Sequence, residues 1–146
     1  MRVNFKAIPL QTPHPALPGQ QFQWWPILNV VLFYKHKRTP AIEAVVDSGS
    51  QTCLFHANFG RLIGIDIESG VEGPLGGVIG GAMGKVYYHK IRALVAGESY
   101  EIAAGFSHQL SCAGLLGQVG FFDHFVTTFD YTPYPPCFEV TRIRVN

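Results

Sequence analysis

Apolar residues in this chain fall in short runs that are separated by glycine, proline and polar residues. Valine, isoleucine, phenylalanine and tyrosine dominate the runs, and 16 glycines and 10 prolines are spread between them. Short apolar or alternating runs bounded by turn-forming residues are typical of β-strands. The pattern therefore predicts an all-β domain with many turns.

The strand predictions follow one another through most of the chain. Residues 41–47 are expected to form the hairpin partner of the first long strand, across a turn at residues 35–40. The shorter apolar segment 113–117 precedes the strands near the C-terminus. Strands are predicted at residues 25–34, 41–47, 85–95, 98–106, 126–131 and 138–145.

Helix signals are few. Phe121, Phe122 and Phe125 occupy positions i, i+1 and i+4, which would place an aromatic stripe on one face of a helix over residues 118–125. Residues 56–59 also have a composition that fits a helical turn. We therefore expect one short helix near the C-terminus and at most a single turn elsewhere.

One domain is expected to span residues 1–146. This length allows one hydrophobic core and is too short for two well-buried ones. Residues 11–20 carry three prolines and one glycine, so residues 1–23 are expected to form an N-terminal arm or loop. The core is predicted at about residues 24–131, followed by a C-terminal strand within residues 132–146.

Composition excludes several classes of function. Apolar residues make up 47% and charged residues 14%, with a net charge of +1, so neither a disordered chain nor a nucleic-acid-binding surface is indicated. No apolar run is long enough to span a membrane, and no membrane partner is expected. Asn4, Lys6 and Pro9 interrupt any signal-peptide core.

Cysteine and histidine spacing points to no metal site and no cofactor. The sequence has three cysteines and lacks C-x-x-C and H-E-x-x-H motifs. An odd number of cysteines without paired spacing also argues against a disulfide framework. We expect a cytoplasmic protein in a reducing compartment.

Residues 44–50, Ala-Val-Val-Asp-Ser-Gly-Ser, carry the first candidate chemistry. An apolar strand here leads directly into the carboxylate of Asp47, and such a group costs free energy unless partners hold it. Gly49 lets the backbone turn tightly beside that carboxylate. Asp, Ser and Gly are also common in ordinary turns, so the segment alone fits either a simple turn or a catalytic loop.

A second motif, Leu115-Leu116-Gly117, starts 68 residues after Asp47, and residues 70–84 between them hold seven glycines. In this order the three segments resemble the retropepsin family of aspartic proteases. They are similar to that family's Asp-Thr/Ser-Gly catalytic loop, its glycine-rich flap hairpin and the aliphatic-aliphatic-Gly strand that supports the loop. The resemblance covers roughly residues 24 to 131.

The resemblance implies a closed, β-barrel-like acid protease lobe with a flap and one short C-terminal helix. Pepsin-like enzymes carry two catalytic motifs, whereas this chain carries one, which implies a homodimer with Asp47 from each copy in a shared site. The implied activity is hydrolysis of a peptide or protein substrate by water activated between the two carboxylates. The alternative is an inactive dimerisation or peptide-binding module of the same fold.

The same resemblance assigns roles to individual residues. Two departures accompany it: Gln118 stands where retroviral members usually have an arginine that ties the dimer together, and Ser50 stands where many have alanine. If the Ser50 hydroxyl reached Asp47, it would favour the ionised carboxylate. Asp47, Ser48 and Gly49 are the catalytic loop, Ser50, Leu115, Leu116 and Gly117 support it, and Gly77, Val78, Ile79, Gly80 and Gly81 form the flap, with Met83 and Tyr87 as further candidates to line the cleft.

The terminal segments have two possible places. Residues 138–145 alternate as a strand should, and residues 2–8 could pair with them. By the resemblance they would build a dimer sheet, because strands at a sheet edge pair readily. They could equally complete a sheet within their own protomer.

Overall fold

A computed structural model describes residues 1–76 and 82–144 of the chain. Most of the chain is β-strand, as the sequence predicted. The elements are β1 (Arg2–Asn4), β2 (Lys6–Pro9), β3 (Phe22–Trp25), β4 (Ile27–Tyr34), β5 (Lys37–Arg38), β6 (Ile42–Val46), β7 (Leu54–His56), α1 (Ala57–Leu62), the 3₁₀ turn η1 (Ile67–Ser69), β8 (Val71–Gly76), β9 (Ala82–Val95), β10 (Glu98–Ser107), β11 (Gly114–Leu116), β12 (Phe125–Asp130) and β13 (Cys137–Arg142).

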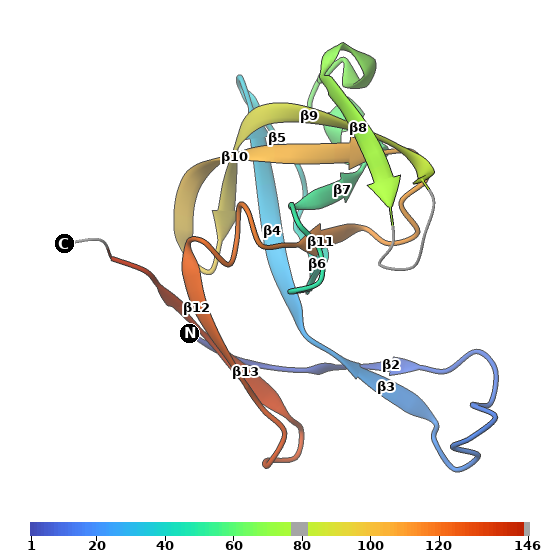
Figure 1. The fold of residues 1–146 in the computed structure, drawn as a ribbon. Helices are drawn as coiled ribbons and strands as arrows, with labels where there is room; N and C mark the ends of the chain where they lie inside the picture. Colours follow the sequence, from blue (N-terminus) through green and yellow to red (C-terminus); the bar gives the residue numbers. More distant parts are fainter. Residues whose placement is uncertain (77–81, 145–146) are drawn as a thin grey trace.

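Six strands close into a barrel. Their order is β4, β6, β11, β7, β10 and β9, and an additional antiparallel pairing of β9 with β4 joins the two ends (Figure 1). Strand β5 pairs antiparallel with β4, and β8 pairs antiparallel with β9. The expected all-β, closed-barrel architecture is therefore confirmed.

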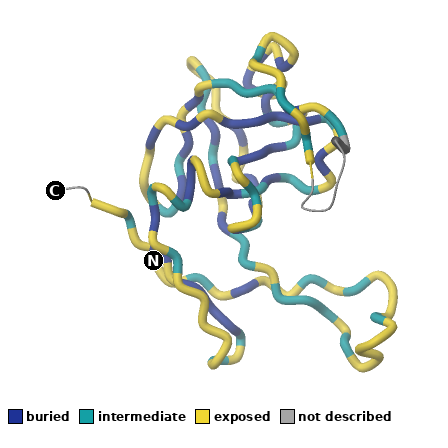
Figure 2. Tube along the Cα trace, viewed as in Figure 1, coloured by how far each residue is buried: buried dark blue, intermediate teal, exposed yellow. Residues whose placement is uncertain are grey.

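The alternating pattern of the strands fills the barrel. In β4, Leu28, Val30 and Leu32 are buried, while the residues between them are partly or fully exposed. Facing them from β6 are Ile42 and Ala44, also buried. Because successive side chains of a strand point to opposite faces, one apolar set from each strand makes the core. Figure 2 shows these buried stretches gathered in the barrel.

The one short helix lies at Ala57–Leu62, where a helical turn was expected, and the helix predicted over residues 118–125 is not formed. That segment is a series of tight turns. Gly120 adopts a φ of 105°, which a right-handed helix does not allow, and its N–H donates to the Asp123 carboxylate at 2.9 Å. Phe121 and Phe125 are nevertheless buried, so the aromatic pattern marked core contacts and not helical periodicity.

Two ribbons lie outside the barrel. One is the hairpin β2–β3 with its connecting loop, and the other is β12–β13, to which β1 adds a third strand (Figure 1). Strand β13 pairs with β1 on one edge and β12 on the other, so both of its edges are occupied within the chain. No α-helix among the described residues is long and apolar enough to cross a membrane.

Candidate active site

The carboxylate of Asp47 stands at the end of the buried strand β6. Its own N–H donates to the carbonyl oxygen of Leu116 at 3.0 Å, and its carbonyl accepts from the Ser50 N–H at 3.1 Å. One carboxylate oxygen, Oδ1, accepts from the Gly49 N–H at 2.9 Å. A Cβ atom on residue 49 would lie 3.2 Å from that oxygen, so glycine suits this close approach. The backbone thus fixes a half-buried carboxylate in a tight turn.

Strand β11 supports this turn from the side. It runs parallel to β6, with Leu116 opposite Val46, and antiparallel to β7. At the end of β11, a Cβ atom on Gly117 would lie 2.3 Å from the carbonyl oxygen of Thr52 and 2.6 Å from that of Ser50. Only glycine allows the two segments to pack this closely. The two sequence motifs therefore meet in space, as the resemblance implied.

Backbone and side-chain hydrogen bonds join the same two segments. The N–H of Gln118 donates to the carbonyl of Ser50 at 2.8 Å, and the N–H of Val119 donates to that of Gln51 at 2.9 Å. The side-chain amide of Gln118 donates to the carbonyl of Ser48 at 2.9 Å. Gln118, which replaces the expected arginine, thus holds the Asp47 turn within its own chain.

The Ser50 hydroxyl does not serve Asp47. Its single proton is donated to the carbonyl oxygen of Thr52 at 2.8 Å. The conditional expectation that this hydroxyl stabilises the ionised carboxylate therefore has no support in the geometry. Ser50 instead stabilises the backbone that follows the Asp47 turn.

A cavity of about 500 Å³ opens beside Asp47. The side of this cavity formed by residues 47–52 is polar, and its wall from β7, β8, β9 and β11 is mainly apolar. The hydroxyl groups of Thr52 and Tyr88 lie 3.1 Å apart and link the loop to β9. The described lining residues are Asp47, Gly49, Ser50, Gln51, Thr52, Leu54, Pro74, Leu75, Gly76, Val86, Tyr88 and Leu115.

The hairpin predicted as a flap is present as the antiparallel pair β8–β9. The flap residues Gly77, Val78, Ile79, Gly80 and Gly81 lie outside the described residues. Among the tyrosines, Tyr88 lines the cavity, whereas Tyr87 packs against the main core, so the expectation for Tyr87 was wrong. Successive residues of a strand face opposite ways, and the sequence alone did not reveal which of the two faces the cavity.

Sequence reasoning also missed Thr52, Leu54, Leu75 and Val86. Their apolar or hydroxyl character is ordinary for strands and gave no signal. They come together because β8 pairs with β9, and β10 joins β9 to β7 in the same sheet. Such a lining depends on strand order, which periodicity does not reveal.

Asp47 is the single acidic residue among the described residues that line the cavity. Two other carboxylates lie elsewhere: Asp123 accepts from the backbone N–H of Gly120, and Asp66 precedes η1. Nearby, burial raises the pKa of the Cys112 thiol, and the charge of Asp47 raises it further. One chain therefore offers one carboxylate to this cavity.

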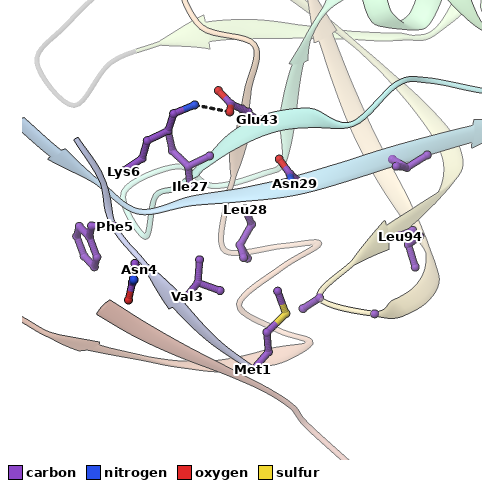
Figure 3. Close-up of a pocket in the computed structure, with 13 residues that line it drawn as sticks. Met1, Val3, Asn4, Phe5, Lys6, Ile27, Leu28, Asn29, Glu43 and Leu94 are labelled. Atoms are coloured by element: carbon purple, nitrogen blue, oxygen red, sulfur yellow. Dashed lines mark hydrogen bonds and ion pairs between the residues drawn. The ribbon is translucent and has the colours of Figure 1, made fainter. Parts of the chain in front are cut away.

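A second cavity, of about 620 Å³, lies between β1 and the outer face of β4 (Figure 3). Met1, Val3 and Leu94 are among its apolar lining residues, and an ion pair between Lys6 and Glu43 lies on its rim. The acidic group here is already paired with a lysine, so the cavity lacks the free carboxylate that marks the Asp47 site.

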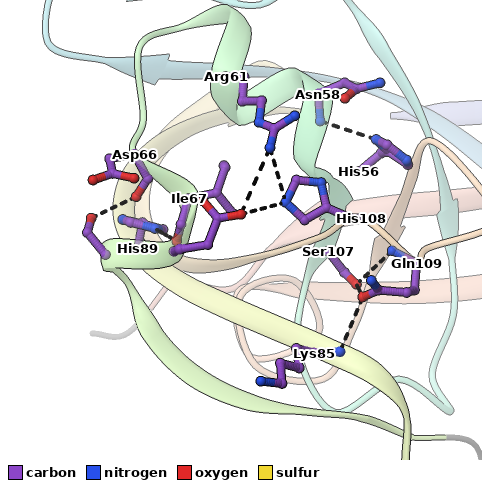
Figure 4. A network of polar contacts seen from close by, with 12 residues as sticks. His56, Asn58, Arg61, Asp66, Ile67, Lys85, His89, Ser107, His108 and Gln109 are labelled. Atoms are coloured by element: carbon purple, nitrogen blue, oxygen red, sulfur yellow. Dashed lines mark hydrogen bonds and ion pairs between the residues drawn. The ribbon is translucent and has the colours of Figure 1, made fainter.

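A polar network links α1, η1 and the end of β10 (Figure 4). The Glu68 carboxylate accepts from His108 at 2.9 Å and lies 3.9 Å from Arg61. This hydrogen bond, followed by weaker charge effects of His108 and Arg61, holds the pKa of Glu68 below its usual range. The group is exposed, so the network is a surface feature of modest energy. In the described part of the chain, no cluster of three or more histidine, cysteine or acidic residues could hold a metal ion.

The fold and the site define a closed all-β barrel that presents one backbone-held carboxylate beside a cavity lined in part by a β-hairpin. No protein-family model matches the sequence, and no curated protein sequence matches it. Two solved structures are similar. The retroviral protease-like domain of Ddi1 from Leishmania major is 17% identical, with a TM-score of 0.48 over 69% of this chain and 80% of that domain. The EIAV protease in complex with the inhibitor HBY-793 is 16% identical, with a TM-score of 0.40 over 64% and 82% of the two chains.

Proposed function

We propose that this protein is an aspartic endopeptidase that acts as a homodimer, with one Asp47 from each copy in a shared active site. The observation that carries the proposal is the Asp47 turn itself. At the end of strand β6, the Asp47 carboxylate accepts from the backbone N–H of Gly49 and lines a cavity that is also lined by the β8–β9 hairpin. Gly117, packed against the carbonyl oxygens of Thr52 and Ser50, supports the segment that follows this carboxylate.

The chemistry follows from bringing two such carboxylates together. Two carboxylates that nearly touch cannot both ionise, so they share one proton. The ionised Asp47 removes a proton from a bound water, which attacks the peptide carbonyl, while the protonated Asp47 donates to the carbonyl oxygen. The tetrahedral intermediate then returns that proton to the second Asp47 and its C–N bond breaks, while the proton taken from water passes to the leaving amine. No covalent intermediate forms on the protein. The two apparent pKa values belong to the pair and not to either copy.

The cavity wall supports a peptide substrate in extended form. Leu75 and Leu115, which are partly exposed, offer apolar surface to a side chain, and the arms of the hairpin β8–β9 form part of the same wall. An extended peptide bound beside a hairpin gains main-chain hydrogen bonds by strand addition, while pockets select alternate side chains. The reaction assigned here is therefore cleavage within a peptide chain.

The test is cleavage of a mixed peptide library between about pH 3 and pH 7, because the mechanism needs one proton shared by the two carboxylates. Asp47→Asn is expected to abolish cleavage, and pepstatin is expected to inhibit it. Asp66→Asn is the matched control, because Asp66 is exposed and its carboxylate makes no capping bond to η1. Cleavage that survives Asp47→Asn would sink the proposal. A folded dimer that cleaves nothing would instead favour the inactive dimerisation or peptide-binding module.

A further inference from the structure

Exposed apolar side chains are concentrated outside the barrel. Among the described residues, eleven large apolar side chains are exposed, and eight of them lie on the ribbons and terminal segments. A ninth, Val119, lies two residues after Gly117, the glycine that packs against the Asp47 turn. Isolated exposed apolar residues are normal, but a concentration of them marks an interaction surface. The eight are Met1, Leu17, Trp25, Val126, Phe129, Tyr131, Tyr134 and Ile143.

Aromatic rings join the two ribbons. Trp24 of β3 meets Tyr134, from the turn between β12 and β13, edge to face at 5.6 Å, and Phe22 lies 4.9 Å from Trp24. On the other ribbon, Phe129 and Tyr131 both pack on the ring of Phe5, at 6.0 and 5.0 Å. We call the set Phe22, Trp24, Phe129, Tyr131 and Tyr134 the aromatic ribbon surface.

This surface is fixed in place but only partly covered. Tyr131 is 67% exposed and Tyr134 is 82% exposed, although both rings make aromatic contacts. Figure 2 shows that most of the two ribbons is exposed or half-buried, in contrast to the barrel. Rigid aromatic residues that retain exposed area lose little conformational freedom when they bind, and they dominate the energy of protein interfaces.

The base of the β2–β3 ribbon lies beside Asp47. The N–H of Val46 donates to the carbonyl of Pro26 at 2.8 Å, and Pro26 directly follows β3. Ile27 pairs with Val45 in the same ladder. Figure 1 shows the ribbons projecting from the end of the barrel near the loop that follows β6. A protein that binds the ribbons and reaches their base would therefore meet the Asp47 turn.

We propose that the aromatic ribbon surface binds a second copy of this chain and thereby places the two Asp47 turns together. The inference rests on the proposed function, because the cavity offers one carboxylate where the reaction needs two. The five residues of the surface are uncharged, so two identical copies meet without like-charge repulsion, as a two-fold interface requires. The tyrosine hydroxyls can donate to the facing copy.

Sedimentation velocity over a range of protein concentrations tests the inference. Tyr134→Lys and, separately, Phe129→Lys place a charge on the surface of each copy, and each is expected to raise the dimer dissociation constant at least about tenfold. Tyr134→Phe should leave it nearly unchanged. Leu62→Lys is the matched control, because Leu62 is 57% exposed on α1, away from both ribbons. Circular dichroism and urea unfolding establish that each variant is folded.

Each outcome separates this surface from the proposed activity. A dimer that weakens with both ribbon variants and not with Leu62→Lys supports the inference, whether or not peptides are cleaved. A wild-type dimer unaffected by either ribbon variant overturns it and leaves the protease proposal standing. A wild-type monomer that still cleaves peptides through Asp47 overturns both this inference and the shared two-carboxylate site. If the ribbon variants act through dimerisation, their cleavage rate per chain recovers at high protein concentration, whereas a change within the active site would persist.

Discussion

Replacing Gly117 with alanine tests the close packing that supports the Asp47 turn. The new Cβ would lie 2.3 Å from the carbonyl oxygen of Thr52 and 2.6 Å from that of Ser50. Both obstacles are backbone atoms, so no side-chain rotation relieves the clash. Either β11 or the segment after Asp47 must move by about 1 Å to restore van der Waals contact.

The energetic cost follows from that movement. Overpacking a close-packed site costs about 1–3 kcal/mol. The same shift stretches the two backbone hydrogen bonds from Gln118 and Val119 to the carbonyls of Ser50 and Gln51, which are 2.8 and 2.9 Å long, at about 0.5–1.5 kcal/mol each. The expected loss is therefore about 2–6 kcal/mol, a large part of the stability of a domain this size.

Urea unfolding followed by circular dichroism measures the loss as a lower midpoint at unchanged slope. Gly19→Ala is the control, because a Cβ there meets nothing within 4 Å and the residue does not have a left-handed φ. It should change the free energy of unfolding by less than about 0.5 kcal/mol. If Gly117→Ala differed from this control by less than 1 kcal/mol, roughly the lower bound for overpacking, the argument that glycine is required beside Thr52 would be refuted.

Three further predictions follow from individual contacts. Tyr100→Phe removes the buried hydroxyl that donates to the Gly120 carbonyl at 2.8 Å and should cost about 1–3 kcal/mol in urea unfolding, with no loss if water replaces the hydroxyl. His108→Ala should raise the pKa of Glu68 toward its usual value, as an NMR titration would show. Because the pKa of Glu68 is depressed in the folded protein, its ionised carboxylate stabilises the fold above the ordinary carboxyl pKa. This stabilisation is lost as pH falls through the lowered pKa. Burial raises the pKa of the Cys53 thiol to about 12, so mass spectrometry should find it unalkylated at about pH 8 until urea unfolds the chain, and rapid native labelling would contradict this.

Four strands of the barrel, β4, β6, β9 and β10, were predictable because each has one apolar face. Residues 85–95 and 98–106 alternate over most of their length, and they correspond closely to β9 and β10. The meeting of Asp47 with Gly117 was predictable from the resemblance, since the two motifs occur in a fixed order in that family. Periodicity alone did not place them together, because the contact depends on β11 entering the sheet between β6 and β7.

The segment 118–125 shows why a helical pattern of aromatics can mislead. Phe121 and Phe125 pack with their rings 5.1 Å apart, as they would on a helix face. Here a turn brings the two rings into the same contact. Gly120 forms this turn with a positive φ, and its N–H donates to the Asp123 carboxylate. Gly120 was the available signal, because glycine inside a short helix is unfavourable and is common where the backbone must adopt a left-handed conformation.

The rigidity of the Asp47 turn matters more in a dimer than it would in a single-chain site. If a two-fold axis relates two Asp47 carboxylates, a shift of one turn is copied in the other, so the separation of the pair can change by up to about twice the shift. A displacement of about 1 Å, as expected for Gly117→Ala, would then change that separation by up to about 2 Å, and catalytic groups tolerate about 0.5 Å. The support from Gly117 and Gln118 is therefore expected to govern activity more steeply than stability. For Gly117→Ala, both the cleavage rate and the fraction of chains present as folded dimer are measured in the same preparation. The cleavage rate should fall much further than that fraction. A fall in proportion to it would show that the turn is not positioned by β11.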